Sequence, residues 1–576
     1  TNLADADSAA TREWDIVYVH EGNSRVSPTN FYGDSFSFNA DNQFLVGSGG
    51  SLTRAAGSNC GTFSAASNAY LFTIPKQSTN NPLLSNPGGT SIDTNGQGGV
   101  TIANIATQGS GDALVVNGNL EGTAQPWGTT ANPYNTAISQ AGGSSVRNST
   151  FSSDRTTALQ RGVTIAGTSV ATATSGIEFT DTTIDGMTRA SMLIEGNNAI
   201  SNVTYDGVIN SDLAGSAGVI SPLLVIRDNT GTNTFDIATG NPPAGSLLPA
   251  NILSDNAGDG IIIQENANSN TIDIGNISLT NTVDQGIYVF DDSSDLNIRS
   301  DGGSGIVRNT SGAGILVANP TTGIPNVEYF GTIQQDDTGG APGYILHAVD
   351  IADAAGTITL TGPGATPFTG TGDGFLVQRV NGTVTVEGAS LNISGPTGVR
   401  IEGQAGGTAA SGTYTFSNIS ILNLTAGSGS ISDGILLSDL SGATNFANLT
   451  LNIADTNAFG ISATNAGTVN IGGTSTIQTG SATAASIRIY DDGSGGTTTP
   501  DFDLISVISG NPLLDPQTAP DYTAISLISA TAGEINISSV FTVPDPATGN
   551  PTAGTTSNVQ NPSAVPVRVG GAQISP

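Results

Sequence analysis

The segments GIIIQEN (260–266), GIYVFDD (286–292) and GILVANP (314–320) decide the fold, because each repeats the same pattern. A glycine opens the segment, an apolar strand follows, and a polar turn ends it. Equivalent segments begin at Gly343, Gly374, Gly398, Gly434, Gly460 and Ser486. The intervals between openings are 26, 28, 29, 31, 24, 36, 26 and 26 residues. A period near 28 residues with variable insertions is typical of a solenoid.

Further short strands lie between these openings, as in TIDIGNISLTN (271–281) and TVTVEGASLNIS (383–394). Apolar residues at alternate positions place one face inward and leave Thr, Ser and Asn outside. Two or three strands per unit, with no helical period, predict an all-β right-handed parallel β-helix, a three-faced solenoid forming one elongated rod. We also expect polar residues beside the strands to stack into ladders on neighbouring coils. The candidates are Asn276, Asn392, Asn418 and Asn448.

The N-terminal region differs from the repeats that follow it. Residues 1–75 contain the aromatic segments DIVYVHEG (15–22) and DNQFLVGSGG (41–50). We interpret them as capping strands, because an open solenoid end exposes apolar core and unpaired strand edges. The solenoid itself is predicted to span 76–500, with an irregular loop around 120–160.

The C-terminal region also departs from the period. DFDLISVISGNPLLDP (501–516) is echoed 20 residues later by DYTAISLISATAG (521–533), so we predict last coils of short period over 501–543. Residues 544–576 form a tail rich in Pro, Thr and Gly. This tail is predicted to be either a disordered spacer or an extended strand that docks through VPVRVGG (565–571).

Composition excludes several classes of partner. The chain has 76 glycines in 576 residues, and charged residues make up only 11% of it, which suits strands and tight turns. Its 47 acidic and 15 basic residues give a net charge of −32, which disfavours binding to nucleic acid or to anionic membranes. The apolar runs are too short to insert into a membrane. The sequence starts without methionine or a signal peptide, so we expect a mature, processed chain.

The N-terminal segments and the glycine-initiated coils resemble large bacterial surface proteins with right-handed parallel β-helix repeats, some of them similar to autotransporter passengers or to pectate-lyase-like solenoids. The resemblance covers most of the chain and is architectural. It implies export and a rod-like fold, with a secreted, extracellular or cell-surface location. It implies no particular chemistry.

Candidate catalytic groups are few. The acidic pairs Asp291/Asp292, Asp336/Asp337 and Asp491/Asp492 lie in turns, where aspartate is favoured for local backbone hydrogen bonding, so we predict turn roles for them. The Gly-His-Gly and Arg-Ile-Lys motifs of polygalacturonase-like hydrolases are absent. For a lyase, Asp291, Asp292 and Asp295 are the candidate calcium ligands and Arg299, Arg379 and Arg400 the candidate bases. These arginines stand at different offsets from their coil openings and need not share a face.

The remaining reactive residues are isolated. His20 and His347 are the only histidines, Cys60 is the only cysteine and Lys76 is the only lysine, so one chain can build neither an intramolecular disulfide nor a cysteine metal site. The GTGDG string (370–374) lacks the helix that a phosphate site requires. We therefore predict no catalytic, cofactor-binding or metal-binding residue and no cofactor.

The sequence thus predicts a non-enzymatic extracellular structural subunit that self-associates head to tail into a surface fibre, filament or layer. The first alternative is a monomeric adhesin or passenger rod that binds glycans or a partner surface of the cell envelope. The second alternative is a polysaccharide lyase or hydrolase.

Overall fold

The computed structural model of residues 1–576 divides into two compact units, unit 1 (1–283 and 292–304) and unit 2 (284–291 and 305–576). The structure describes residues 3–11, 15–19, 35–47, 51–53, 70–73, 81–84, 86, 89–109, 112–119, 144–153, 161–169, 176–187, 189–197, 202–212, 222–237, 252–255, 260–267, 270–275, 277–280, 285–299, 306–308, 313–318, 326–334, 349–362, 368–370, 373–393, 397–404, 409–422, 424, 432–453, 458–480, 485–493, 497–510, 524–530, 532–544, 551–554 and 558–575.

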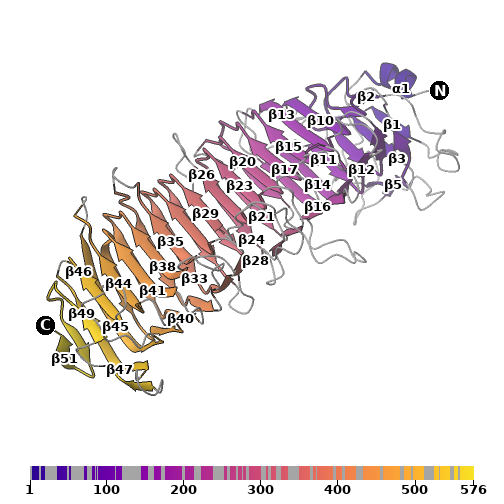
Figure 1. The fold of residues 1–576 in the computed structure, drawn as a ribbon. Coiled ribbons are helices and arrows are strands. Elements are labelled where there is room, and N and C mark those ends of the chain that lie inside the picture. The colour runs from indigo at the N-terminus through magenta and orange to yellow at the C-terminus, as the bar shows by residue number, and fades with distance from the viewer. Residues whose placement is uncertain are drawn as a thin grey trace. The chain divides into compact units, whose positions relative to one another are not determined.

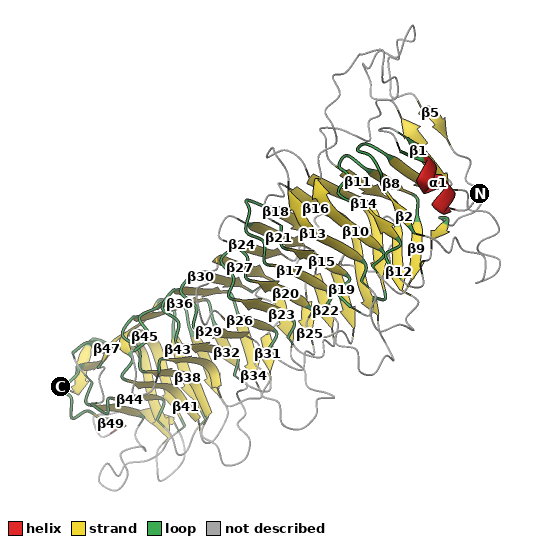
Figure 2. Ribbon diagram, turned by 90° about the horizontal axis from the view of Figure 1, so that it is seen from above, coloured by secondary structure: helices red, strands yellow, loops and turns green. Residues whose placement is uncertain are grey.

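Each unit contains two stacks of parallel strands, which we call sheet A and sheet B, and Figures 1 and 2 show the strands of each stack side by side. In unit 1, sheet B consists of β2 (Phe36–Ser37), β7 (Ile92–Asp93), β10 (Leu114–Asn119), β13 (Val163–Ser169), β15 (Met192–Glu195), β17 (Leu224–Arg227) and β20 (Ile261–Gln264). Sheet A of unit 1 consists of β1 (Ile16–Val19), β3 (Phe44–Gly47), β6 (Leu83–Leu84), β8 (Thr101–Ala103), β9 (Ala106–Gly109), β11 (Ser144–Arg147), β12 (Thr150–Ser153), β14 (Gly176–Asp185), β16 (Asn202–Asp212), β18 (Thr234–Ile237), β19 (Ile252–Asp255), β21 (Thr271–Gly275), β22 (Ile277–Thr280) and β24 (Asp295–Arg299).

Unit 2 repeats this arrangement. Its sheet B consists of β23 (Ile287–Phe290), β26 (Ile315–Ala318), β29 (Val349–Ala352), β32 (Phe375–Gln378), β35 (Thr397–Glu402), β38 (Ser432–Ser438), β41 (Ala458–Thr464), β44 (Ile487–Tyr490), β46 (Ile525–Ile528) and β49 (Val559–Gln560). The parallel strands of its sheet A are β25 (Ile306–Arg308), β27 (Asn326–Phe330), β28 (Thr332–Gln334), β30 (Thr357–Thr361), β31 (Phe368–Gly370), β33 (Thr383–Glu387), β34 (Ser390–Ile393), β36 (Thr413–Ser417), β37 (Ser420–Leu422), β39 (Ala443–Ala447), β40 (Thr450–Ile453), β42 (Gly467–Gly472), β43 (Thr476–Thr479), β45 (Thr498–Ser509), β47 (Glu534–Pro544) and β50 (Val567–Val569).

One coil contains a sheet-B strand followed by two sheet-A strands, as in β32, β33 and β34. Each strand pairs in parallel with the equivalent strand of the next coil. This confirms the predicted all-β parallel β-helix with three strands per coil; its right hand stays a prediction. Residues 99–119 contain three strands, β8, β9 and β10.

The two sheet-A strands of a coil meet at a tight turn whose first residue often has a positive φ, as at Asn418 (φ 55°) and Asn448 (φ 54°). Asparagine tolerates this left-handed backbone better than most residues because its short amide bonds locally. The Asn448 Nδ2 donates to the Asn418 Oδ1 of the neighbouring coil at 2.9 Å, which confirms the ladder predicted for this pair. Asn276 and the side chain of Asn392 lie outside the described residues.

The opening glycines are required by the packing of the core. A Cβ at Gly434 would lie 2.5 Å from Ile453 Cδ1, and a Cβ at Gly398 would lie 2.8 Å from Ile421 Cγ2. These glycines therefore face inward, where the isoleucine of their own coil leaves no room for a side chain.

Both chain ends contain elements that the repeat pattern did not predict. Helix α1 (Leu3–Ala9) packs on β2, and the Gln43 Nε2 donates to the Ala10 carbonyl just after the helix (3.0 Å). Near the other end, β48 (Pro551–Ala553) pairs antiparallel with β47, and β51 (Ala572–Ser575) pairs antiparallel with β50. The 544–576 tail thus contributes docked strands within the described residues. A separate antiparallel hairpin in unit 1 joins β4 (Ser51–Thr53) to β5 (Tyr70–Thr73).

Two details of the predicted pattern are wrong. The coil expected to open at Gly343 has its sheet-B strand six residues later, at β29, since Val349 pairs with Ile315 and Phe375. In β29, Val349 and Ile351 supply the alternation, and residues 341–348 lie outside the described part of the chain. The echoed segments at 505–509 and 525–529 are not equivalent either, because the first lies in β45 of sheet A and the second in β46 of sheet B.

Candidate functional site

Sheet B of unit 2 places charged and aromatic side chains on its outer side. Parallel pairing aligns Arg400 of β35 with Leu436 of β38, and Ser462 of β41 with Arg488 of β44. These residues alternate with buried isoleucines and valines, so they face outward. The positions before the opening glycines form a second row, in which Thr397, Asp433 and Phe459 lie side by side. Thr397 and Phe459 are buried, and Asp433 keeps partial exposure. We call Asp373, Arg400, Asp433, Phe459, Arg488 and Tyr490 the sheet-B patch.

Arg400 connects carboxylates from two coils. Its Nη1 lies 3.6 Å from Asp373 Oδ2, and its Nη2 lies 2.8 Å from Glu402 Oε2. The Gln378 Nε2 donates to the other oxygen of Glu402. Asp373 is 2% exposed, so its ion pair with Arg400 is largely shielded from solvent and is stronger than a surface pair. Arg400 is therefore held in one position between β32 and β38.

Asp433 has one carboxyl oxygen whose hydrogen bonding is unsatisfied. Its Oδ1 is buried and has no hydrogen-bond partner, although the residue as a whole keeps partial exposure. Burial raises the pKa of Asp433 to about 7; the positive charges of Arg488 and Arg400 lower the pKa and the negative charge of Asp373 raises it. At neutral pH the carboxyl is thus divided between its protonated and ionised forms.

Arg488 lies between two aromatic rings. Its guanidinium carbon is 5.2 Å from the centroid of the Phe459 ring and 5.5 Å from that of the Tyr490 ring. Both distances suit a cation–π contact, which fixes the flexible side chain. Tyr490 is 37% exposed, so it offers an aromatic surface next to a fixed positive charge. The patch therefore combines hydrogen-bond donors, an unsatisfied acceptor and an apolar ring surface.

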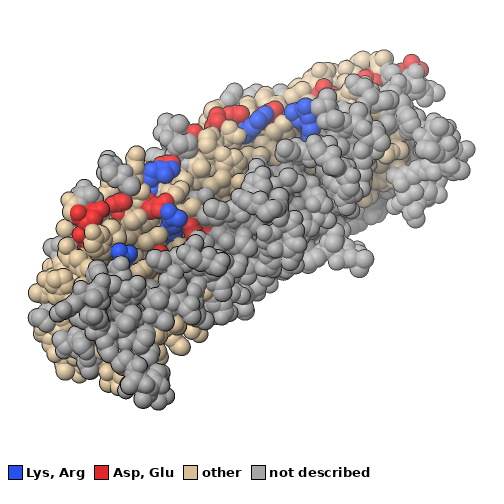
Figure 3. Space-filling view, in the orientation of Figure 1, with Lys and Arg blue, Asp and Glu red and all other residues tan. Residues whose placement is uncertain are grey.

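Among the residues that Figure 3 colours, basic side chains lie beside acidic ones. In unit 1, for example, Arg227 contacts Glu195 at 2.6 Å and Asp228 at 3.8 Å. This mixing is consistent with the sequence, in which the few cations are dispersed.

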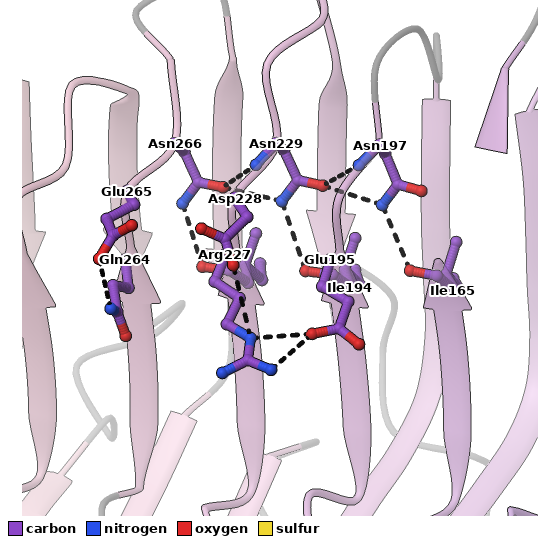
Figure 4. Close-up of polar contacts among 11 residues, drawn as sticks. Ile165, Ile194, Glu195, Asn197, Arg227, Asp228, Asn229, Gln264, Glu265 and Asn266 are labelled. Atoms are coloured by element: carbon purple, nitrogen blue, oxygen red, sulfur yellow. Dashed lines mark hydrogen bonds and ion pairs between the residues drawn. The ribbon is translucent and has the colours of Figure 1, made fainter. Parts of the chain in front are cut away.

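A buried row of amides lies beside these unit 1 ion pairs, in the turns after β15, β17 and β20 (Figure 4). The Asn197 Nδ2 donates to Asn229 Oδ1 (2.9 Å), the Asn229 Nδ2 donates to Asn266 Oδ1 (2.7 Å), and the Asn266 Nδ2 donates to Asp292 Oδ1 (2.9 Å). The same amides donate to the carbonyls of Ile165, Ile194 and Ile226. Every bond joins one coil to another, so this row supports the fold rather than a ligand.

The candidate residues from the sequence do not gather in one place. Asp292 is fully buried and accepts from Ser294 N and Oγ as well as from Asn266, while Asp291 occupies a left-handed turn position (φ 46°). Asp491 accepts from the Thr498 backbone N–H and hydroxyl, both at 2.7 Å. These contacts are those of turn residues.

Other candidates are similarly placed or fall outside the described residues. Asp492 accepts from the Asn465 Nδ2 (2.8 Å), and Arg379 pairs with Asp353 through two bonds of 2.7 Å. Asp295 begins β24. Asp336, Asp337, His20, His347, Cys60, Lys76 and the side chain of Arg299 lie outside the described residues. Among the residues that are described, no group of three or more His, Cys, Asp or Glu is arranged to hold a metal ion.

Sequence analysis named Arg400 as a candidate base but missed the other members of the sheet-B patch. The signal that could have found two of them is an aspartate directly before an opening glycine, as in Asp373–Gly374 and Asp433–Gly434. That position lies beside the opening glycine, whereas the pairs Asp291/Asp292 and Asp491/Asp492 follow the strand and lie in turns.

Comparison with known proteins adds no functional information. No family profile, curated protein or solved structure matches the chain. Within the described residues, no helix is long and apolar enough to cross a membrane. Function must therefore be argued from the site itself.

Proposed function

We propose that this chain is an extracellular glycan-binding protein of the adhesin type, and that the sheet-B patch binds the glycan. The observation that carries the proposal is Asp433, whose buried Oδ1 has no donor, beside an Arg488 that two aromatic rings hold in place. An unsatisfied buried acceptor costs free energy that a ligand hydroxyl can recover.

A sugar fits this combination of groups. Its hydroxyls both donate and accept, so they can donate to Asp433 and accept from Arg488. Its C–H faces are apolar and can pack on the exposed ring of Tyr490. A nucleic acid fits poorly, since the chain carries a net charge of −32. The low charge content and the turn-rich strands support an extracellular location, which stays part of the proposal.

Head-to-tail assembly into a fibre, the first expectation from the sequence, stays a prediction. The C-terminal strands weigh against the version in which the tail is exchanged between copies. Val559, Val565 and Val567 are buried, and the Asn561 Nδ2 donates to the Val565 carbonyl and to Ser575 Oγ of β51. The tail is thus docked on its own chain, and we place glycan binding first.

The test is binding of the purified full chain to an array of immobilised oligosaccharides, neutral and uronic-acid-containing. We expect binding to a related set of glycans, weakened at least about tenfold by Arg488→Ala, which removes a charged hydrogen-bond donor. The matched control is Arg227→Ala, because Arg227 is also a partly exposed arginine of a sheet-B strand and pairs with Glu195 outside the patch. Capture of no glycan, or equal loss in both variants, would contradict the proposal.

A further inference from the structure

We propose that the sheet-B patch also hydrolyses the glycan that it binds, with Asp433 as the proton donor and Asp373 as the carboxylate that activates water. This inference rests on the proposed function and adds a reaction to it. The sequence did not select either residue, and the argument comes from their placement in the fold.

The two carboxyls are separated by one coil. The Gly374 N–H donates to the Thr397 carbonyl (3.0 Å), which sets Asp373 beside Thr397, and Thr397 pairs with Asp433. Two coil spacings of about 4.8 Å place the two backbones roughly 9.6 Å apart. Carboxyls of inverting glycosidases stand about 6.5–9.5 Å apart, which leaves room for a water molecule and the sugar ring. Side chains of this length reach that separation.

The two carboxyls have different surroundings, as acid and base roles require. Asp373 pairs with Arg400, the Nη1 of which lies 3.6 Å from Asp373 Oδ2. Asp433 has no hydrogen-bond donor at Oδ1 and faces Arg400 and Arg488 only at longer range. Burial outweighs these cations and raises its pKa to about 7, so a protonated fraction exists at neutral pH.

Arg400 acts as a positioning residue in this scheme. It lies on the intermediate coil, between the strands that follow Asp373 and Asp433, and Glu402 and Gln378 hold it from the other side. Arg488 is fixed by Phe459 and Tyr490 and is placed to bind the substrate beside Asp433. Neither arginine needs to transfer a proton.

The reaction balances with water as the only co-reactant. Asp433 gives its proton to the glycosidic oxygen as the bond from that oxygen to the anomeric carbon breaks. The oxygen of a water molecule forms the new bond to the anomeric carbon, and Asp373 takes the proton that this water loses. The products are two shorter glycans, and exchange of one proton with solvent restores both carboxyls.

The experiment incubates the full chain with the same oligosaccharide panel in solution, in water enriched in oxygen-18. Mass spectrometry then detects cleavage and the label at the new reducing end, and binding is measured in parallel. We expect labelled products from the wild-type chain and, at saturating glycan, a rate at least about 100-fold lower for Asp433→Asn and Asp373→Asn. The control is Asp439→Asn, which lies in the turn after β38 and tolerates its positive φ of 53° as asparagine.

Each outcome bears on the inference. Binding without cleavage by the wild-type chain overturns hydrolysis and leaves glycan binding intact. Cleavage that persists in a folded Asp433→Asn variant overturns the assignment of the acid. Unsaturated products without the label indicate elimination and also overturn it. If the wild-type chain neither binds nor cleaves any glycan, both proposals are overturned. These wild-type results decide the matter even if Asp373→Asn fails to fold.

Discussion

Replacing Asn229 with alanine removes the central amide of the buried row in Figure 4. The Asn229 Nδ2 donates to Asn266 Oδ1 (2.7 Å) and to the Ile194 carbonyl (3.3 Å), and its Oδ1 accepts from the backbone N–H and the Nδ2 of Asn197 (3.1 and 2.9 Å). A buried hydrogen bond contributes about 1 kcal/mol net, and a group that loses its partner costs more. Four lost bonds are therefore expected to lower the free energy of unfolding by roughly 3–5 kcal/mol.

The assay is urea unfolding of the full chain, combined with hydrogen exchange at the amides of 192–197 and 224–229, because solenoids can unfold segment by segment. The control is Asn297→Ala, which loses one half-buried bond to Asp273 (2.9 Å) and should cost less than about 1 kcal/mol. A cost for Asn229→Ala no larger than that of the control would refute the argument that the row stabilises the coils.

Three further predictions follow from the same physics. The pKa of Asp433 rises from 3.8 to about 7 on folding, so the stability linked to this carboxyl is complete below about pH 3.8 and is lost as the pH rises toward 7. Asp433→Asn should therefore stabilise the protein by roughly 2–4 kcal/mol at pH 8 and change little at pH 4, as measured by urea unfolding; equal effects at both pH values would contradict this. Removing residues 551–576 deletes β48–β51 and exposes the strand edges and apolar core that these strands cover. We therefore expect more self-association, measured by analytical ultracentrifugation. A truncated chain that stays monomeric would argue against a capping role for these strands. Gly442→Ala places a Cβ 1.8 Å from the Gly412 carbonyl oxygen and should lower the free energy of unfolding by at least about 2 kcal/mol in the same assay. Gly472→Ala is the control, because the space around its Cβ is open, and should lower that free energy by less than about 1 kcal/mol. Similar losses in the two variants would mean that the backbones shift easily.

The sequence predicts the fold well because each coil repeats the same local pattern of residues. An opening glycine followed by alternating apolar residues marks β20, β23, β26, β32 and β38 at their observed positions. Helix α1 was missed, since one short helix leaves no periodic signal beside so many strands. The coil at Gly343 was misplaced because GYILHAV and VDIA are both apolar enough for a strand, and only pairing with Ile315 and Phe375 selects the second.

The candidate site could be predicted only in part. Asp373 and Asp433 are 60 positions apart in the sequence, and insertions of different length separate their coils. Only the register of β32, β35 and β38 places them on one face. The unsatisfied oxygen of Asp433 and the shift in its pKa depend on burial, which a sequence pattern does not give.

The amide row of unit 1 also has a direction. Each Nδ2 from Asn197 to Asn266 donates toward the next coil, so the side-chain dipoles align, and their positive ends point to the carboxylate of Asp292. Burial raises the pKa of Asp292, while the hydrogen bonds from Ser294 and Asn266 lower it. The row is thus a side-chain counterpart of a helix macrodipole, with a carboxyl group at its positive end, and α1 is the one α-helix among the described residues.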